Sequence, residues 1–294
     1  MIITVPATSA NMGPGFDCLG VAVKFHNTIE ITPSRFFSVS VRGEGARFLK
    51  TKGGNIFLNI FNEKYEKLTG KRENFRFKFE NNIPISRGLG SSSAVIVSAV
   101  TAAYAMAGQT PEKQTILEEA LVYETHPDNI TPATFGGFNV AVADKGRVHR
   151  VGIPMDETLR AVVTIPDKPI STRASRNALP KKLPLGEAVF NVGRSSLMVA
   201  ALMQKDYGLL RAASEDRFHQ HIRMRLLPQL FDVQRTALNA GALMSTLSGS
   251  GSSFFNLVSD ADAALELAKA LRSQFPRFRT EIFEFDNDGV RSQQ

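Results

Sequence analysis

The sequence contains a single cysteine, Cys18, among its 294 residues. One cysteine excludes an internal disulfide and any metal site that is built from several thiolates. A catalytic thiol would need a base beside it, and the neighbouring sequence offers none. We therefore interpret Cys18 as a small buried residue.

Long apolar runs are also missing. The stretch at 94–108 contains Ser98, Thr101 and Tyr104, and it is shorter than the ~20 residues that a membrane-spanning helix needs. It is typical of a buried helix. The first residues, MIITVPATSA, lack the basic region and the continuous apolar region of a secretory signal. We therefore expect a cytoplasmic protein with no membrane partner.

Basic residues are in moderate excess over acidic ones. The sequence has 35 Lys and Arg against 28 Asp and Glu, a formal net charge of +7. A basic protein suits an anionic partner, either nucleic acid or a phosphorylated small molecule. The basic residues are scattered, with no long basic tail and no aromatic-basic signature of RNA binding. This distribution favours a small anion over nucleic acid, and an ordinary basic surface remains the plain alternative.

The first third of the chain predicts strands around one helix. Residues rich in β-branched and aromatic types occupy 2–7, 21–32, 36–42 and 75–80, the last in strict alternation. The segment 55–68 has helical spacing, with Gly53 and Gly54 before it and Gly70 after it. We expect a sheet with one solvated face and one amphipathic helix.

Helices follow from Ser91. The pattern predicts a helix over 91–107 and another over 112–124, with Thr110 as N-cap and Pro127 as its end. A short helical turn and two strands are expected within 133–144 and 148–153. The turn-rich segment 152–159 is our candidate domain boundary, which divides the chain into 1–154 and 155–294.

The second half combines both kinds of element. Strands are expected at 160–166, 242–248, 253–259 and 278–286, and helices at 185–204, 226–241 and 261–275. A helix, two strands, a helix and a strand in this order indicate an open sandwich. The expected fold class is α+β, and the 43% apolar content is sufficient for two domains.

A glycine-serine turn stands directly before the first long helix, in the sequence PISRGLGSSSAVIVSAV at 84–100. Gly88 and Gly90 flank Leu89, and three serines open the helix. The start of a helix has unpaired N–H groups and a partial positive charge, so this turn predicts a seat for phosphate. It matches neither the GxxxxGK[ST] loop nor the GxGxxG motif. A flexible turn with a serine N-cap is the alternative for the turn alone.

Three further loops are rich in small polar residues. They are VPATSANMGPGFDCLG at 5–20, ETHPDNITPATFGG at 124–137 and LSGSGSSFF at 247–255. Polar loops at the ends of strands are common places for a small polar ligand. The second loop offers Glu124, His126, Asp128 and Asn129, which together could meet Mg²⁺ and a hydroxyl.

These four motifs, in this order, resemble those of the GHMP kinase superfamily and, within it, the homoserine kinases. The segments 170–180 and 216–228 are also similar to homoserine kinase segments. The resemblance spans Val5 to Phe255. It implies an N-terminal domain like domain 2 of ribosomal protein S5 and a ferredoxin-like C-terminal domain, with ATP and substrate at their junction.

The resemblance implies transfer of the γ-phosphoryl group of ATP to the side-chain hydroxyl of L-homoserine, a step of threonine biosynthesis. It assigns phosphate binding to the turn at Arg87, Gly88, Leu89, Gly90, Ser91, Ser92 and Ser93. Asn55 would lie near the adenine. Mg²⁺ is assigned to Ser92 and Glu124, with Glu118 as the competing ligand.

The resemblance also implies the amino-acid site. Asn11 and Asp17 would bind the substrate, with Asp17 on its ammonium group, and Arg176 and Arg223 would bind its carboxylate. Gly249 and Gly251 would complete this site. Nearby arginines compete for the carboxylate, namely Arg173, Arg217 and Arg225.

Asn129 stands where many relatives in the superfamily have an aspartate base. Its amide cannot accept a proton at neutral pH, so Asn129 would orient the hydroxyl and the proton would pass directly to the γ-phosphate. We expect Asp128 to be an exposed residue of the turn. If its side chain instead pointed inward, it would restore ordinary base catalysis. His126 is expected to be a structural hydrogen-bonding residue.

Other functions remain in competition at this stage. The nearest is another GHMP kinase that acts on mevalonate, a sugar or an isoprenoid precursor, which would have no need of the acid and the two arginines. A nucleic-acid-binding protein with an S5-like domain and a nucleotide sensor without turnover are more distant alternatives. The sequence leaves the oligomeric state open, with a homodimer as one option.

Overall fold

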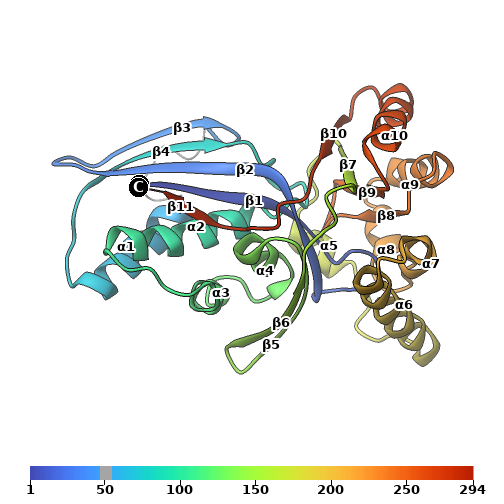
Figure 1. The fold of residues 1–294 in the computed structure, drawn as a ribbon, viewed down its shortest axis with the longest axis horizontal. Coiled ribbons are helices and arrows are strands. Elements are labelled where there is room, and N and C mark those ends of the chain that lie inside the picture. Colours follow the sequence, from blue (N-terminus) through green and yellow to red (C-terminus); the bar gives the residue numbers. More distant parts are fainter. Residues whose placement is uncertain (47–54, 294) are drawn as a thin grey trace.

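The computed structural model describes residues 1–46 and 55–293. Two β-sheets organise the chain, each in its own domain (Figure 1). The first sheet has seven strands, in the order β11-β1-β2-β4-β3, with β5 paired to β2 and β6 paired to β5. Its strands are β1 (Ile2–Ala10), β2 (Leu19–Pro33), β3 (Ser38–Gly43), β4 (Phe75–Asn81), β5 (Phe138–Asp144), β6 (Arg147–Ile153) and β11 (Arg291–Gln293).

Strand β2 is the longest element of this sheet. It pairs with β1 along almost its whole length, with β4 through Thr28–Pro33 and with β5 through Leu19–Val21. The alternation predicted for β4 is confirmed, because Phe75, Phe77 and Phe79 are buried and the residues between them are exposed. One face of the sheet therefore carries the aromatic core.

Four helices cover that face. They are α1 (Ile56–Thr69), α2 (Ser91–Met106), α3 (Lys113–Leu121) and α4 (Pro127–Phe135). Gly70 ends α1 in the left-handed conformation, as its position predicted. The glycines expected before α1, Gly53 and Gly54, lie outside the described residues. Helix α2 is the buried helix expected at 91–107.

The boundaries of α3 and α4 differ from the prediction. Helix α3 has Glu112 rather than Thr110 as its N-cap residue, and it ends at Leu121. The expectation that Pro127 ends this helix is wrong: Pro127 begins α4, because proline fits the first turn, where its missing N–H is not needed. Glu124 therefore lies in the turn between the two helices.

The second sheet has four antiparallel strands in the order β10-β7-β9-β8. They are β7 (Arg160–Ile165), β8 (Met244–Leu247), β9 (Phe254–Val258) and β10 (Arg279–Phe283). Helices α9 (Gln229–Asn239) and α10 (Ala261–Gln274) pack on this sheet. The chain order of strands and helices is that of a ferredoxin-like unit. The expected α+β class is confirmed.

The remaining helices of the described residues lie between β7 and α9. They are α5 (Thr172–Asn177), α6 (Leu185–Gln204), the 3₁₀ helix η2 (Tyr207–Leu209), α7 (Leu210–Ala213) and α8 (Gln220–Met224). Helix α6 has the bounds that the sequence predicted. The helix expected at 226–241 is confirmed with a later start, because α9 begins at Gln229, directly after Pro228, and α8 precedes it as a separate short helix.

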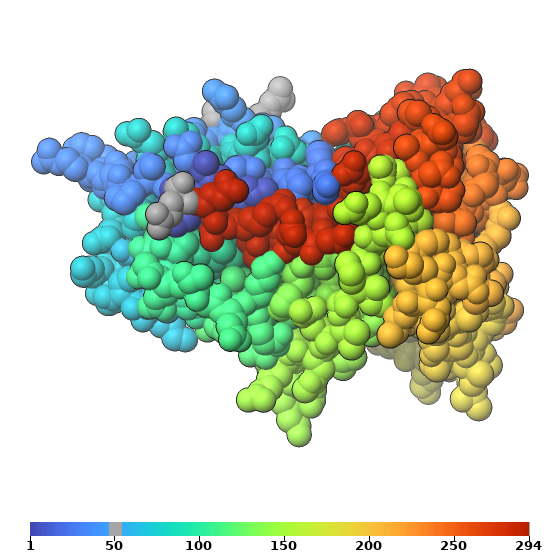
Figure 2. Space-filling model, viewed as in Figure 1, coloured from blue at the N-terminus to red at the C-terminus, as the bar shows by residue number. Residues whose placement is uncertain are grey.

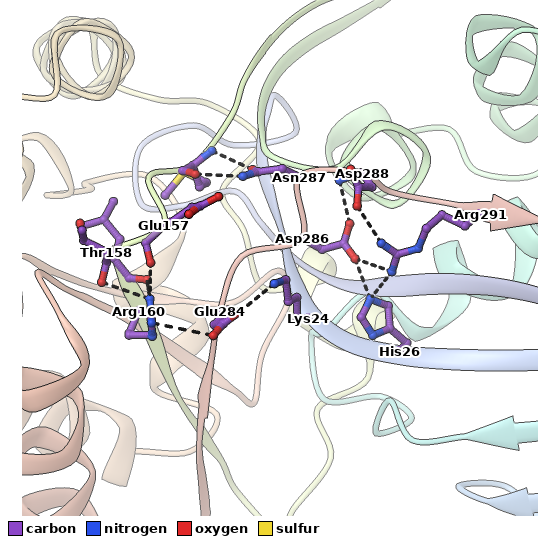
Figure 3. Close-up of polar contacts among 12 residues, drawn as sticks. Lys24, His26, Glu157, Thr158, Arg160, Glu284, Asp286, Asn287, Asp288 and Arg291 are labelled. Atoms are coloured by element: carbon purple, nitrogen blue, oxygen red, sulfur yellow. Dashed lines mark hydrogen bonds and ion pairs between the residues drawn. The ribbon is translucent and has the colours of Figure 1, made fainter.

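The end of the chain returns to the first domain. Figure 2 shows this segment crossing the surface of that domain, and β11 then pairs with β1. Asp286 anchors it, accepting hydrogen bonds from the backbone N–H groups of Asp288 and Gly289 and lying 2.6 Å from Nε2 of His26 and 2.9 Å from Nη2 of Arg291 (Figure 3). The chain passes from the first sheet to the second between Ile153, the end of β6, and Arg160, the start of β7. The exact division of the domains at residue 154 stays a prediction.

Among the residues that the structure describes, no helix combines the length and the apolar character that crossing a membrane requires. Cys18 is half-buried rather than buried. Burial raises the pKa of its thiol.

Candidate active site

A cavity of about 330 Å³ lies between the two domains. Its wall includes residues of the first domain together with Thr172, Arg176, Arg223 and Ser250 of the second. Most of the residues singled out from the sequence line it: Asn11, Asp17, Asn55, Arg87, Gly88, Leu89, Gly90, Ser91, Ser92, Ser93, Glu124, Asn129, Arg176, Arg223 and Gly249. The four predicted loops thus meet at one place.

The start of α2 forms one wall of the cavity. Gly90 is its N-cap residue, with φ of 67°, and no side chain caps the first turn. Ser92 is exposed, Ser91 is half-buried and Ser93 is buried. The serine N-cap that was the alternative interpretation is therefore absent from this helix. Its first N–H groups and the positive end of its dipole face a cavity, which is the arrangement that binds anions.

The two glycines of the turn have neighbours within the protein itself. A Cβ on Gly88 would lie 2.1 Å from the carbonyl oxygen of Ser248, and one on Gly90 would lie 1.9 Å from Oγ1 of Thr8. Both glycines also have positive φ. Close packing of the turn against β1 and the 248–251 loop thus accounts for these glycines without a ligand.

Arg87 lines the cavity with its side chain already engaged by the backbone. Its guanidinium donates to the carbonyl oxygens of Ile85, Pro166 and Asp167, at 3.1, 3.0 and 2.6 Å. These contacts tie the glycine-serine turn to the segment that follows β7 in the second domain. Arg87 therefore helps to join the two domains, and its assignment to phosphate binding stays a prediction.

Asp17 and Arg176 bind each other. Nη2 and Nη1 of Arg176 donate to the two carboxylate oxygens of Asp17 at 2.7 and 3.1 Å. Asp17 is held by Asn11, whose Oδ1 accepts from the backbone N–H of Asp17 at 2.9 Å. Asn11 and Asp17 both have positive φ, which asparagine and aspartate tolerate better than most residues. The two side chains predicted to bind opposite ends of a substrate, Asp17 and Arg176, therefore form an ion pair.

Arg223 is almost completely buried, with 2% of its surface exposed. Its Nη1 donates to the carbonyl oxygen of Gly249 at 3.1 Å and lies 3.3 Å from Nδ1 of His219. Its Nε has no hydrogen-bond partner among the described residues. Burial, together with the positive charge of Arg176, lowers the pKa of Arg223 to about 10. A buried cation with a free donor in a cavity wall is suited to an anionic ligand.

Sequence reasoning missed His219, which is fully buried beneath this site. Its Nε2 lies 2.7 Å from the carbonyl oxygen of Gly13, and burial lowers the pKa of His219 to about 4. The imidazole is therefore neutral and links the 11–17 loop to Arg223. The carboxylate of Asp216 caps α8 by accepting hydrogen bonds from the backbone N–H groups of His219 and Gln220. The position of His219 three residues after this aspartate was the only sign of its location in the sequence.

Gly249 and Gly251 differ in position. Gly249 lines the cavity and its N–H donates to the carbonyl oxygen of Ala10, whereas Gly251 does not belong to the lining. Gly251 faces the side chains of Leu247 and Ile170 instead. The three arginines that competed for the carboxylate, Arg173, Arg217 and Arg225, also lie outside the lining. Arg217 forms an ion pair with Glu187 at 3.5 Å.

The expectation for Asp128 is wrong. Its side chain is buried, with 4% of the residue exposed, and it lines the cavity rather than the outer surface of a turn. Nδ2 of Asn129 donates to Oδ1 of Asp128 at 3.3 Å, and Oδ1 of Asn129 accepts from Thr8 at 2.8 Å. Burial, reinforced by the charge of Asp17, raises the pKa of Asp128 to about 7.

Glu124 and Glu118 are separated by the fold. Glu124 lines the cavity, whereas Glu118 lies on α3 outside the lining and accepts a hydrogen bond from Gln114. His126 stands between Glu124 and Asp17, at 3.6 and 3.4 Å, and its Nδ1 contacts the hydroxyl of Thr125. A hydrogen bond with Glu124 raises the pKa of His126 against the opposing effect of burial.

Apolar side chains form another part of the cavity wall. Ile29, Phe57, Phe79 and Ile85 line it beside Asn55, whose side chain caps α1 through the N–H of Leu58. Sequence reasoning assigned Phe57 and Phe79 to elements but not to the site. Their signal was only that of core residues on a helix and a strand, which does not distinguish packing from ligand binding.

Comparison with known proteins agrees with this geometry. Residues 55–137 match the model of the GHMP kinases N terminal domain, and residues 198–277 match that of GHMP kinases C terminal. The homoserine kinase of a Nitratiruptor species is 56% identical over 290 residues, which cover 99% of each chain. That of Campylobacter jejuni is 54% identical, over 98% of this chain and 99% of the relative.

Solved structures show the same fold. The crystal structure of homoserine kinase from Cytophaga hutchinsonii superimposes with a TM-score of 0.89 at 28% identity, covering 99% of this chain and 96% of that one. The L. major mevalonate kinase structure reaches 0.70 at 17% identity, over 96% and 95% of the two chains, and shows the fold alone. From this agreement in sequence and fold, the chain belongs to the homoserine kinase family of the GHMP kinases.

Proposed function

We propose that this enzyme transfers the γ-phosphoryl group of ATP to the side-chain hydroxyl of L-homoserine and releases O-phospho-L-homoserine and ADP, within threonine biosynthesis. One observation carries the proposal. The cavity brings the uncapped start of α2 together with the carboxylate of Asp17 and the guanidinium groups of Arg176 and Arg223. The first suits a triphosphate, and the three charged groups suit the ammonium and carboxylate of an amino acid.

ATP is proposed to lie with its phosphates at Gly88–Ser93 and its base near Asn55. The wall contributed by β2, α1 and β4 contains Ile29, Phe57 and Phe79 together with Asn27 and Asn81. A purine is an apolar plane with polar edges, so a wall with both kinds of side chain suits it. In this arrangement the base and the charged substrate bind at different parts of the cavity wall.

Mg²⁺ fits a part of this wall. The described residues contain no group of three or more His, Cys, Asp or Glu side chains that could hold a metal by themselves. Mg²⁺ needs no such cage, because it is commonly held by one or two carboxylates together with substrate phosphates and water. Glu124 and the hydroxyl of Ser92 are the proposed protein ligands. When bound, the ion would neutralise charge on the transferred phosphoryl group.

L-homoserine is proposed to replace the ion pair between Asp17 and Arg176 with its own contacts to both side chains. Its ammonium group would bind Asp17, and its carboxylate would bind Arg176 and Arg223. Each charge of the zwitterion then meets an opposite charge that the protein already holds in place. Mevalonate or a sugar offers no ammonium group to Asp17, which disfavours both as substrates.

Proton transfer is proposed to involve Asp128, since its side chain points inward. Asn129 orients the substrate hydroxyl, and the hydroxyl oxygen forms its bond to the γ-phosphorus as the bond to the β,γ-bridging oxygen breaks. The hydroxyl proton passes to the carboxylate of Asp128, and ADP leaves. A pKa of about 7 is close to the value that favours a general base at neutral pH.

Purified protein with ATP and Mg²⁺ tests the proposal. ADP release should depend on L-homoserine, and mass spectrometry should identify O-phosphohomoserine. Mevalonate and galactose, each at the same concentration, serve as controls for the other GHMP kinase activities. Turnover of either control without turnover of L-homoserine would contradict the proposal. Binding of generic RNA or DNA at physiological salt without ATP binding would support the nucleic-acid alternative.

A further inference from the structure

The imidazole of His219 lies beside Arg223, and the proposed phosphoryl transfer does not use it. The ring is fully buried, and its two nitrogens have different partners. Nε2 lies 2.7 Å from the carbonyl oxygen of Gly13, and Nδ1 lies 3.3 Å from Nη1 of Arg223. One side chain thus contacts both the loop that carries Asp17 and an arginine of the proposed carboxylate site.

These two partners decide which nitrogen of His219 carries the proton. A carbonyl oxygen only accepts hydrogen bonds, so Nε2 must donate to Gly13. A guanidinium only donates, so Nδ1 must accept from Arg223. The neutral imidazole with its proton on Nε2 meets both requirements. Burial lowers the pKa of His219 to about 4, which keeps the ring neutral at physiological pH.

The contact with His219 restricts the orientation of Arg223. Nη1 of Arg223 donates to Nδ1 of His219 and also to the carbonyl oxygen of Gly249 at 3.1 Å, which uses both of its N–H bonds. Because the guanidinium is planar, fixing Nη1 also fixes the direction of Nη2, which takes part in neither contact. The protein thus sets the direction from which this arginine can approach an anion.

The 11–17 loop packs against the same segment of the second domain. A Cβ on Gly13 would lie 2.5 Å from the carbonyl oxygen of Ser214, so the two backbones are in close contact there. Phe16 packs edge to face on Phe218, with ring centroids 4.7 Å apart. The hydrogen bond between His219 and Gly13 therefore belongs to an extended contact, which restricts where the loop can place Asp17.

Phe16 also lies close to both arginines of the site. Its ring centroid is 5.2 Å from Cζ of Arg176 and 5.0 Å from Cζ of Arg223. The face of an aromatic ring attracts a cation at such distances. The two guanidinium groups otherwise disfavour each other, since the charge of Arg176 contributes to the lowered pKa of Arg223. Phe16 thus favours the placement of two cations where one carboxylate could bind both.

We propose that His219 is a positioning residue for the substrate carboxylate, which acts by holding Arg223 in a fixed place relative to Asp17. The inference rests on the proposed function, in which Asp17 binds the ammonium group of L-homoserine and Arg223 its carboxylate. His219 is not part of the cavity wall, so it acts through Arg223 rather than on the substrate. Its contribution is to affinity for an α-amino acid, not to the transfer step.

Two substitutions separate the contacts of His219. In His219→Asn the amide oxygen lies near the position of Nδ1 and can still accept from Arg223, but the side chain no longer reaches Gly13. In His219→Gln the amide nitrogen lies near the position of Nε2 and can still donate to Gly13, but Arg223 loses its acceptor. Asparagine is the smaller side chain and leaves the larger cavity, so a role in packing alone would make His219→Asn the worse variant.

Steady-state kinetics with ATP and Mg²⁺ should give the opposite order. His219→Gln should raise the KM for L-homoserine by about tenfold or more, with kcat and the KM for ATP changed by about threefold or less. His219→Asn should raise the KM for L-homoserine by about threefold or less. His221→Gln is the matched control, because His221 is exposed on the same helix and should leave all three values unchanged. Circular dichroism checks that each variant is folded.

Nuclear magnetic resonance tests the tautomer without any variant. In the wild-type chain, labelled with nitrogen-15 in its five histidines, His219 should show a proton on Nε2 and none on Nδ1 from pH 8 to pH 6. An unperturbed imidazole would gain its second proton within this range, since its pKa is about 6.5. A proton on Nδ1 of His219 would contradict the hydrogen bond from Arg223.

The proposal would be overturned if the KM for L-homoserine rose as much in His219→Asn as in His219→Gln, or if neither variant changed it. A proton on Nδ1 would overturn it as well. The same assay keeps the proposed function separate, because a wild-type chain that does not turn over L-homoserine contradicts that function before any variant is compared.

Discussion

Arg176 and Asp17 come from different domains and hold each other with two parallel hydrogen bonds in the wall of the cavity. The pair neutralises a carboxylate and a guanidinium that would otherwise face the cavity unpaired, which would be costly. A zwitterionic substrate can replace both partners without leaving a charge unmatched. The ion pair thus holds both charged groups in the positions where an amino acid would bind them.

Replacing Arg176 by lysine tests this role. Lysine keeps the positive charge but loses the planar fork that binds a carboxylate through two donors. We expect the KM for L-homoserine to rise by about 10- to 100-fold, with a smaller change in kcat. Steady-state kinetics measure both. Arg173→Lys, in the same helix but outside the cavity lining, is the matched control; equal KM values for the two variants would remove Arg176 from the substrate site.

Asp128→Asn tests the proton acceptor. The amide has nearly the same shape as the carboxyl group but cannot accept the proton, so kcat should fall by about 100-fold or more. The wild-type rate should also decline as the pH falls below about 7, and the variant should lose this dependence. A kcat near the wild-type value would instead mean that the proton passes directly to the γ-phosphate.

The same residue predicts a pH dependence of stability. Since the pKa of Asp128 is raised from 3.8 to about 7 by folding, the native state binds more protons than the unfolded state between these values. The free energy of unfolding therefore decreases as the pH rises through this range, by on the order of 4 kcal/mol. Asp128→Asn removes this loss. Thermal melts should show a larger gain in Tm for the variant at pH 8 than at pH 5, and an equal gain at both would contradict the raised pKa.

Glu124→Gln tests the proposed magnesium ligand. The apparent affinity for Mg²⁺ should weaken by about tenfold or more. Mutation of a residue that only hydrogen-bonds to a metal ligand already has an effect of this size. Titration of activity with Mg²⁺ at saturating ATP measures it. Glu118→Gln should leave the titration unchanged, because Glu118 does not line the cavity. The reverse result would transfer the assignment to Glu118.

Asp286 predicts a structural effect away from the cavity. Burial would raise the pKa of this carboxyl group, but contacts with His26, Gly289 and Arg291 hold it below its usual value. Asp286→Ala removes the partner of the His26 imidazole, of the Arg291 guanidinium and of two backbone N–H groups, and should lower the free energy of unfolding by about 3–5 kcal/mol. Asp288→Ala, an exposed partner of Arg291, should cost about 1 kcal/mol or less. Urea denaturation compares them.

Regular elements of this fold were predictable where local patterns were strong. The bounds of α6, the alternation in β4 and the start of α2 at Ser91 follow from periodicity and from small residues next to apolar runs. The ends of helices near proline residues were predicted less well. The backbone around Pro127 and Pro228 allowed either a stop or a start, and only packing decided between them.

The composition of the site was predictable from its motifs, whereas the state of individual side chains was not. The burial of Asp128 depends on the approach of β2, since a Cβ on Gly20 would lie 1.9 Å from the carbonyl oxygen of Asp128. Arg87 is engaged by carbonyl groups about 80 residues later in the sequence. Such contacts join distant segments, and no local spacing encodes them.

The pairing of β11 with β1 has a consequence for biosynthesis. Ile2 lies opposite Gln293, so one edge of the first sheet remains open until residues 291–293 have been synthesised. The strands of the first domain that are translated early therefore emerge without one of their partners, and the sheet is completed only when β11 has left the ribosome.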